Sequence, residues 1–329
     1  MPSPLWRGGL FVCRALVRAM TISEIINKAV EKAGRTPENI LSVEVLLAYC
    51  LNLEKEDLFM EPGREISATE VNRFVPLFER FIMGEPVAYL TGIKEFYGLD
   101  FYVDANVLIP RPETELLVDK VLSVVPDKGA EVKILDVGTG SGCIAISLAK
   151  RLPSAMITAT DISGPAIEIA RRNAFSHGVE SRINFVVTDL MENIEGPFDF
   201  VVANLPYIGK EKFNFVSREA EKYEPHVALF GGDDGLRLYE KLFRQLNSQK
   251  WRPRFFMGEF GFLQGDEMRR ILGEHFGGLG RDILKDYASI ERIFVVGFDP
   301  PHTSRRRVCF KKEVRVSGHD SHERKTTEN

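Results

Sequence analysis

The stretch that decides the fold is residues 132–142, which read Val-Lys-Ile-Leu-Asp-Val-Gly-Thr-Gly-Ser-Gly. Residues 132–137 form a short apolar run that predicts a buried strand. The glycines that follow allow positive φ angles and a close approach of the backbone to a ligand, so a turn is expected at 138–142. A helix is expected next, at 143–152. The stretch therefore predicts a strand, a glycine loop and a helix.

Strand and helix patterns alternate from this point to about residue 298. Such alternation predicts parallel strands joined by crossover helices on both faces of one sheet. The expected strands are 132–137, 156–160, 183–187, 198–203, 254–259 and 293–298, and the expected later helices are 165–177, 236–246 and 264–276. Ligands on such a sheet bind beyond the carboxyl ends of the strands. The residues directly after each strand are therefore the candidates for a site.

The chain of 329 residues has about twice the length of an average domain, and its sequence divides into five expected segments. These are an extension at 1–19, a helical domain at 20–90, a hairpin connector at 91–112, the α/β domain at 113–298 and a disordered tail at 299–329. The helical domain is expected because its apolar residues recur at helical spacing. Aromatic and β-branched residues around glycines predict the hairpin. The tail is expected because it is charged and has almost no apolar periodicity.

The composition excludes several classes of protein. With 44% apolar and 27% charged residues the chain is globular, and its net charge of −4 argues against a protein that coats nucleic acid by charge alone. Four widely spaced cysteines predict neither a disulfide framework nor a zinc site and favour a reducing compartment. No apolar run is long enough to span a membrane. A cytoplasmic protein without a metal is expected. Mitochondrial import is the alternative if the acid-poor, Arg-bearing residues 1–19 are a transit peptide; they could also be a non-native extension.

The glycine loop also predicts the class of ligand. Asp161 ends the next expected strand, 23 residues after Gly138, where a carboxylate can accept both hydroxyls of a ribose. Cys143 stands where a dinucleotide pattern would have its third glycine, and no Gly-Lys-Ser/Thr follows, so neither a dinucleotide site nor a P-loop is expected. An acid at 136 would repel phosphate and suit a cation. S-adenosylmethionine carries an ammonium and a sulfonium and no phosphate, and is the expected cofactor. The residues expected to bind it are Asp136, Gly138, Thr139, Gly140, Ser141, Gly142 and Asp161.

A second motif, Asn204-Leu205-Pro206-Tyr207, follows the fourth expected strand at the same edge of the sheet. An amide or aromatic amine nitrogen is a poor nucleophile because its lone pair is delocalised. The Asn204 side-chain oxygen and the carbonyl before Pro206 can accept the two N–H bonds of an NH₂ group and align its nitrogen with a methyl donor. Tyr207 offers a flat face to a planar amide or base. We expect catalytic roles for Asn204, Pro206 and Tyr207, and substrate contacts from these three and Leu205. An ordinary turn is the alternative.

With these motifs the chain resembles the PrmC/HemK family of glutamine N5-methyltransferases, which modify peptide chain release factors. The resemblance covers about residues 20–298 and includes Gly84–Gly92, Glu95–Leu99, Leu108–Glu115, Asp136–Gly142 and the stretch 224–236. It implies a class I (Rossmann-like) methyltransferase domain at 113–298 and a helical domain at 20–90 that docks the release factor. It also implies that the substrate is the glutamine of a Gly-Gly-Gln motif. Cofactor contacts are implied at Gly138–Gly142, Asp161, Asp189, Leu190 and Asn204.

Two departures from the family pattern leave alternatives open. The family usually has Asn-Pro-Pro-Tyr, whereas Leu205 makes the motif similar to that of the rRNA adenine dimethyltransferases. Some members place an aromatic residue against the adenine of the cofactor where this chain has Leu190. An adenine N6-methyltransferase acting on RNA or DNA is therefore one alternative, and a non-catalytic protein that keeps the fold is another. A monomer is expected, with a release factor as partner and nucleic acid met only through a ribosome-associated substrate.

Overall fold

The computed structural model describes residues 20–125 and 127–298. The extension expected at 1–19 and the tail expected at 299–329 lie outside these residues. The amino-terminal part is helical, as the apolar spacing predicts, and its buried side chains form a cluster of their own. Its elements are β1 (Met20–Thr21), α1 (Ile22–Ala33), α2 (Pro37–Leu51), α3 (Asp57–Met60), β2 (Glu65–Ile66), α4 (Ala68–Ile82) and α5 (Val87–Thr91).

A short hairpin follows the helical part. Strand β3 (Ile93–Phe96) pairs antiparallel with β4 (Leu99–Tyr102). The expected hairpin over 91–112 is thus present only in its first half. The pairing ends where Asp104 accepts the backbone N–H of Asn106 at 2.8 Å in a turn. Prolines then follow, and these cannot donate to a ladder. Beyond this irregular segment come a 3₁₀ turn, η2 (Pro112–Thr114), and α6 (Glu115–Val124).

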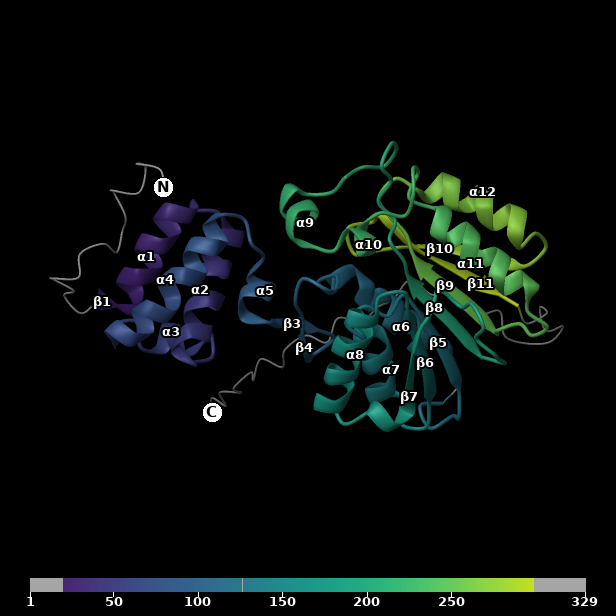
Figure 1. Cartoon of the computed structure of the whole chain (residues 1–329), viewed down its shortest axis with the longest axis horizontal. Coiled ribbons are helices and arrows are strands. Elements are labelled where there is room, and N and C mark those ends of the chain that lie inside the picture. Colours follow the sequence, from purple (N-terminus) through teal and green to yellow (C-terminus); the bar gives the residue numbers. More distant parts are fainter. Residues whose placement is uncertain (1–19, 126, 299–329) are drawn as a thin grey trace, which may run out of the picture. The chain divides into compact units, whose positions relative to one another are not determined.

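The rest of the described chain is built on one sheet of seven strands in the order β10-β11-β9-β8-β5-β6-β7. Figure 1 shows how these strands follow one another across the sheet. The strands are β5 (Lys133–Val137), β6 (Met156–Asp161), β7 (Ile183–Val187), β8 (Phe200–Asn204), β9 (Phe255–Glu259), β10 (Gly280–Lys285) and β11 (Glu291–Gly297). The connecting helices are α7 (Cys143–Arg151), α8 (Gly164–Ser176), η3 (Glu180–Arg182), α9 (Arg218–Tyr223), α10 (His226–Leu229), α11 (Arg237–Ser248) and α12 (Gly265–His275).

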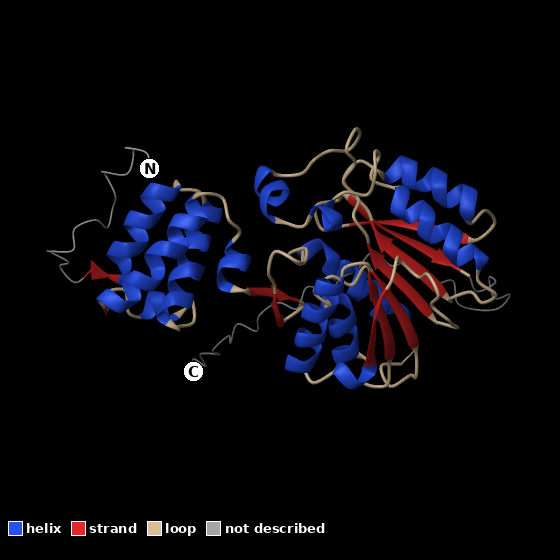
Figure 2. Ribbon diagram, viewed as in Figure 1, coloured by secondary structure: helices blue, strands red, loops and turns tan. Residues whose placement is uncertain are grey.

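Helices cover both faces of this sheet, as the strand–helix alternation predicts (Figure 2). Apolar residues of α6, α7 and α8 share one buried cluster with one set of strand residues. Residues of α11 and α12 share a second cluster with the strand residues that point the other way. The second cluster is rich in rings, and Phe256 meets Phe243 and Phe294 edge to face at 5.5 and 5.1 Å between centroids. The two clusters fix the strands in register and so fix the edge where their carboxyl ends meet.

The last two strands of the chain, β10 and β11, differ from the prediction. The sequence predicts only parallel strands, whereas β11 runs antiparallel to both β9 and β10, and β10 is not predicted at all. A link of five residues, 286–290, joins β10 to β11, and so short a link permits only an antiparallel pair. Strand β10 is largely exposed at the edge and has little alternation, which explains why its sequence carries no strand signal.

Three further observations bear on the expectations from composition. Within residues 20–125 and 127–298, no helix has both the length and the apolar character that a membrane crossing needs. Cys50 and Cys143 are free and buried, while Cys13 and Cys309 lie outside the described residues. The described part of the chain also contains no group of three or more His, Cys, Asp or Glu side chains placed to hold a metal ion.

Candidate active site

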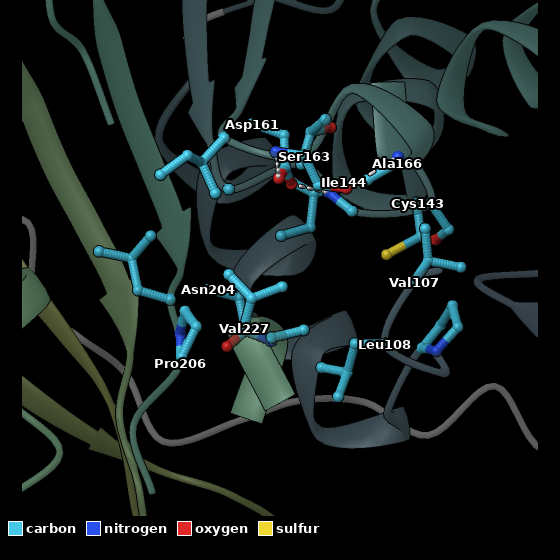
Figure 3. A pocket seen from close by; sticks show the side chains of 18 of the residues that line it. Val107, Leu108, Cys143, Ile144, Asp161, Ser163, Ala166, Asn204, Pro206 and Val227 are labelled. Carbon is cyan, nitrogen blue, oxygen red and sulfur yellow. Dashed lines mark hydrogen bonds between the residues drawn. The ribbon is translucent and has the colours of Figure 1, made fainter. Parts of the chain in front are cut away.

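A cavity of about 240 Å³ lies at the carboxyl ends of β5, β6 and β8. Figure 3 shows Asn204 and Pro206 on the side of the cavity opposite Cys143 and Val107, with Asp161 and Ser163 on a third side. The expected site residues that line it are Gly138, Thr139, Gly140, Ser141, Asp161, Asp189, Leu190, Asn204, Leu205 and Pro206. Asp136, Gly142 and Tyr207 do not line it. Ten of thirteen expected residues thus surround one cavity, although they come from four separate loops.

The glycine loop is held by the backbone of the neighbouring strand. The N–H groups of Gly138 and Thr139 both donate to the carbonyl of Thr160, at 2.8 and 2.9 Å. Gly138, Gly140 and Gly142 have φ angles of 76°, 56° and 84°, which L side chains rarely adopt. Gly142 is also crowded, because a Cβ there would stand 2.9 Å from Ile146 Cδ1. The loop therefore needs glycine both for its conformation and for its packing against α7.

Asp161 ties the second strand to this loop. Its Oδ2 accepts the backbone N–H of Gly140 at 2.9 Å, and its Oδ1 accepts that of Ser163 at 2.9 Å. Burial raises the pKa of Asp161, and these backbone donors oppose the rise. A carboxylate can accept about four hydrogen bonds, so two sites remain for a ligand. Asp161 lines the cavity and can therefore hold the loop and accept ligand hydroxyls at once.

Asp136 lies fully buried beneath the loop. Its Oδ2 accepts the hydroxyl of Thr139 at 2.7 Å, while its Oδ1 has no hydrogen-bond partner. Burial raises the pKa of this carboxyl to about 7, and the nearby charge of Asp161 adds to the rise. A buried acceptor without a partner is rare and costly, and its negative charge below the loop favours a cationic ligand in the cavity above. The orphaned oxygen, the glycine loop and Asp161 together fit a nucleoside ligand with a cationic tail, as S-adenosylmethionine is.

Asp189 and Leu190 lie on the loop that follows β7. The carboxylate of Asp189 forms an ion pair with Lys241 of α11, a partner that the sequence did not predict. Leu190 is buried with a φ of 60°, and its carbonyl accepts the hydroxyl of Thr160 at 2.7 Å. Both residues line the cavity.

The tetrapeptide side of the cavity is organised by side chains. Asn204 and Glu259 end adjacent parallel strands and are paired in register. Thr114 joins them: its hydroxyl donates to Glu259 Oε2 at 2.7 Å and accepts from Asn204 Nδ2 at 2.9 Å. Neither Thr114 nor Glu259 is among the site residues expected from the sequence. The available signal was that Glu259 ends a strand, as Asp161 and Asn204 do.

Tyr207 does not line the cavity, and its side chain contacts the same acid. Its hydroxyl donates to Glu259 Oε1 at 3.3 Å, and its carbonyl accepts from Gln264 Nε2 at 2.8 Å. Glu259 is 1% exposed, and burial raises the pKa of its carboxyl to about 7 despite the hydrogen bond from Thr114. The acid therefore receives a hydroxyl donor on each oxygen, one from Thr114 and one from Tyr207.

Arg111 and Cys143 also line the cavity, and their contacts indicate structural roles. Arg111 donates to Glu224 Oε1 at 2.5 Å, and the other oxygen of this buried acid accepts the N–H of Ile109 at 3.2 Å. This pairing acts as a clasp that ties the Pro110–Pro112 run to Glu224. Cys143 lines the cavity but is only 8% exposed.

Comparisons with known proteins match both the helical part and the part that carries the sheet. A model of the methyltransferase small domain matches residues 113–219, and a model of the PrmC N-terminal domain matches residues 24–92. The crystal structure of the hMettl16 catalytic domain in complex with the MAT2A 3'UTR hairpin 6 is similar in fold, with a TM-score of 0.53. That likeness covers 65% of this chain and 81% of the other at 15% identity, and it supports the fold alone.

Curated proteins share more of their sequence with this chain than that structure does. The release factor glutamine methyltransferase of Koribacter versatilis (strain Ellin345) is 39% identical over 285 residues, which cover 85% of this chain and 99% of the relative. The protein of the same name from Chlorobaculum tepidum is 37% identical over 261 residues, 77% of this chain and 88% of the relative. Identity at this level over nearly the whole of a relative identifies a shared family. The chain belongs to the release factor glutamine methyltransferase family.

Proposed function

We propose that this protein transfers a methyl group from S-adenosylmethionine to the side-chain amide nitrogen, N5, of the glutamine in the Gly-Gly-Gln motif of peptide chain release factors. The observation that carries the proposal is the position and hydrogen bonding of the Asn204 side chain. Its side chain lines the same cavity as the glycine loop, and its amide nitrogen is already engaged by Thr114 at 2.9 Å. Its oxygen is therefore free to accept a substrate N–H. Family membership supplies the substrate class.

The cofactor supplies an electrophilic methyl group when it is bound. The residues that would hold it are the loop Gly138–Gly142, with Asp161 at the ribose hydroxyls and Asp136 beneath the cationic end. Asp189 and Leu190 would lie beside the base. These assignments rest on the orphaned oxygen of Asp136, the remaining acceptor sites of Asp161 and the shared cavity.

Catalysis by the tetrapeptide would be positional and electrostatic. Asn204 Oδ1 and the carbonyl of Leu205 accept the two N–H bonds of the glutamine amide, which holds the nitrogen in line with the methyl group. Acceptors on both N–H bonds also favour the tetrahedral nitrogen that forms during transfer. Pro206 restricts the backbone at this point, since its ring fixes φ and disfavours the helical region for the residue before it. Tyr207 would help to fix the tetrapeptide through Glu259, and it does not line the cavity.

The test is to incubate the purified chain with methyl-labelled cofactor and either a folded release factor or ribosomal RNA, and to locate the label. The proposal expects N5-methylglutamine in the Gly-Gly-Gln loop and no label in a release factor whose motif glutamine is replaced by alanine. Asn204→Ala serves as the inactive control. Label on adenine with the glutamine unmodified would overturn the proposal and would favour the alternative that Leu205 suggests.

The docking role of the helical domain, the oligomeric state and the compartment are also proposals. The helical domain at 20–90 would dock the body of the release factor while its loop enters the cavity, so affinity is shared between distant contacts. We also propose a monomer in the cytoplasm. Mitochondrial import would be the alternative if residues 1–19 direct it, and imaging of a tagged full chain beside a chain that begins at Met20 distinguishes the two.

A further inference from the structure

We propose that Thr114 and Glu259 are positioning residues that decide which end of the Asn204 amide faces the reacting nitrogen. This inference rests on the proposed function, because it concerns how the acceptor of that site is oriented. It gives a role to the Leu108–Glu115 run beyond the clasp that Arg111 forms. It also explains why a buried acid ends β9 beside the tetrapeptide.

The first step is geometric. Asn204 and Glu259 are register partners on β8 and β9, so their side chains leave the sheet next to each other. The hydroxyl of Thr114 lies between them, 2.9 Å from Asn204 Nδ2 and 2.7 Å from Glu259 Oε2. Thr114 is 2% exposed and Glu259 is 1% exposed, so bulk water cannot replace either partner.

The second step counts protons. When Glu259 is ionised, its carboxylate carries no hydrogen and can only accept, so the single hydrogen of the Thr114 hydroxyl points to it. The Thr114 oxygen can then only accept, and the group that donates to it must be the NH₂ end of Asn204. The oxygen of Asn204 is thereby left for the cavity. The direction of every bond in this chain follows from the charge on one buried acid.

The third step considers the Asn204 amide without the hydrogen bonds that link it to Thr114 and Glu259. The two ends of an asparagine amide have almost the same shape, so packing alone hardly distinguishes them. An Asn204 turned by 180° would aim its own NH₂ at the substrate NH₂, and two donors cannot bond. Such a turn removes the acceptor from the reaction without changing the fold. Only the hydrogen-bond direction prevents it.

The direction should depend on pH, because a protonated Glu259 could donate to Thr114 and allow the reverse arrangement. Burial places the pKa of this carboxyl at about 7. The ionisable groups around it are Arg292, whose charge lowers the pKa, Glu113, whose charge raises it, and Tyr207, Tyr239 and Cys143. We therefore expect turnover to increase as the pH rises through about 7.

The experiment compares Thr114→Val, which keeps the shape and removes the hydroxyl, with Thr114→Ser, which keeps the hydroxyl. We expect Thr114→Val to lower kcat at least about tenfold, with KM for the substrate and calorimetric cofactor affinity within about threefold of the parent. Thr114→Ser should recover most of that loss. Thr91→Val is a matched control, because it removes a buried hydroxyl that donates to the Val87 carbonyl at 3.0 Å in α5.

Glu259→Gln adds a second test, since its amide has a shape close to the acid but does not titrate. We expect it to abolish the rise of turnover near pH 7. Equal losses in Thr114→Ser and Thr114→Val, or a kcat for Thr114→Val within threefold of the parent, would overturn the inference.

A readout without any substrate separates this inference from the proposed function. The side-chain amide resonances of Asn204 in a ¹⁵N spectrum are assigned by their loss in Asn204→Ala. We expect them to shift with pH near 7 in the parent and to lose that shift in Thr114→Val. Resonances that are identical in the parent and Thr114→Val would refute the positioning role. If the parent labels adenine instead of glutamine, the proposed function fails, and the same variants are then compared on adenine, whose NH₂ needs the same acceptor.

Discussion

The two sides of the cavity are built in different ways. The proposed cofactor side is centred on one continuous loop, Asp136–Gly142, which backbone hydrogen bonds and the Asp161 carboxylate tie to the next strand. The acceptor side joins residues from three distant segments, since Thr114 is 90 positions from Asn204 and 145 from Glu259. Its bonds run from side chain to side chain. The difference shows that a loop can be specified locally by glycine, whereas an oriented amide requires the assembled sheet.

The largest expected effect lies on the acceptor side. Asn204→Ala removes an acceptor aimed at the reacting nitrogen, and comparable deletions cost about 10²–10³ in kcat. Cofactor affinity should change little, because the loop side is untouched. Single-turnover rates with saturating cofactor, and calorimetry of cofactor binding, measure both. A rate within a few-fold of the parent would mean that the tetrapeptide is only a turn.

The buried acid of the acceptor side, Glu259, should make the free energy of unfolding depend on pH. The pKa of Glu259 is raised by burial to about 7, so the folded state favours the protonated acid. The unfolded chain ionises near pH 4.5, and the free energy of unfolding therefore falls as the pH rises from about 4.5 to 7. The loss is on the order of 3 kcal/mol. Denaturant unfolding of the apoprotein should show a smaller fall over this window in Glu259→Gln, whereas parallel profiles would contradict the raised pKa.

On the cofactor side the expected effect is on binding. Asp161→Ala removes charged acceptors for the ligand and for the Gly140 N–H, and should weaken cofactor affinity by about 2–3 kcal/mol. Asp161→Asn keeps one acceptor and should lose less. Titration calorimetry distinguishes the three proteins. Unchanged affinity in Asp161→Ala would separate this acid from the cofactor site.

The smallest effect is expected at Leu205, where the acceptor side contacts the glycine loop. Leu205 is buried, and a Cβ at Gly138 would stand 2.9 Å from its Cδ2. Leu205→Pro loses a long hydrogen bond, 3.4 Å from its N–H to the Tyr239 hydroxyl, and part of the apolar side chain that packs in the second cluster. The effect on kcat/KM should be about fivefold or less, with glutamine as the substrate in both proteins. A variant that methylates glutamine when the parent does not would show that residue 205 selects the substrate.

The same contrast explains how much could be predicted from the sequence. The strand–loop–helix unit around Gly138 was predicted within a residue or so, because local spacing determines it. Strand β7 was predicted with both bounds. The tetrapeptide was expected directly after the fourth strand, and Asn204 is the last residue of β8. Thr114 was not, because only the pairing of β8 with β9 brings Glu259 beside Asn204 and creates a place for its hydroxyl.

The pair of Asp189 with Lys241 and the exposed strand β10 were missed for a similar reason. Lys241 lies on the exposed side of an amphipathic helix, and nothing in its local sequence indicates which acid it meets. Strand β10 forms because β11 is available as a partner, although its own residues have weak strand character. Contacts of this kind depend on tertiary structure and have no local pattern.

Cys143 has a consequence for chemical selectivity. A sulfonium cofactor is an alkylating agent, and a thiolate is a strong nucleophile that would lie within the same cavity. Burial, with the negative charge of Asp136 nearby, raises the pKa of the Cys143 thiol to about 12, so at neutral pH it stays protonated and unreactive. A methyl donor bound in this cavity as proposed would therefore not alkylate Cys143. Mass spectrometry of protein kept with the cofactor should find Cys143 unmodified.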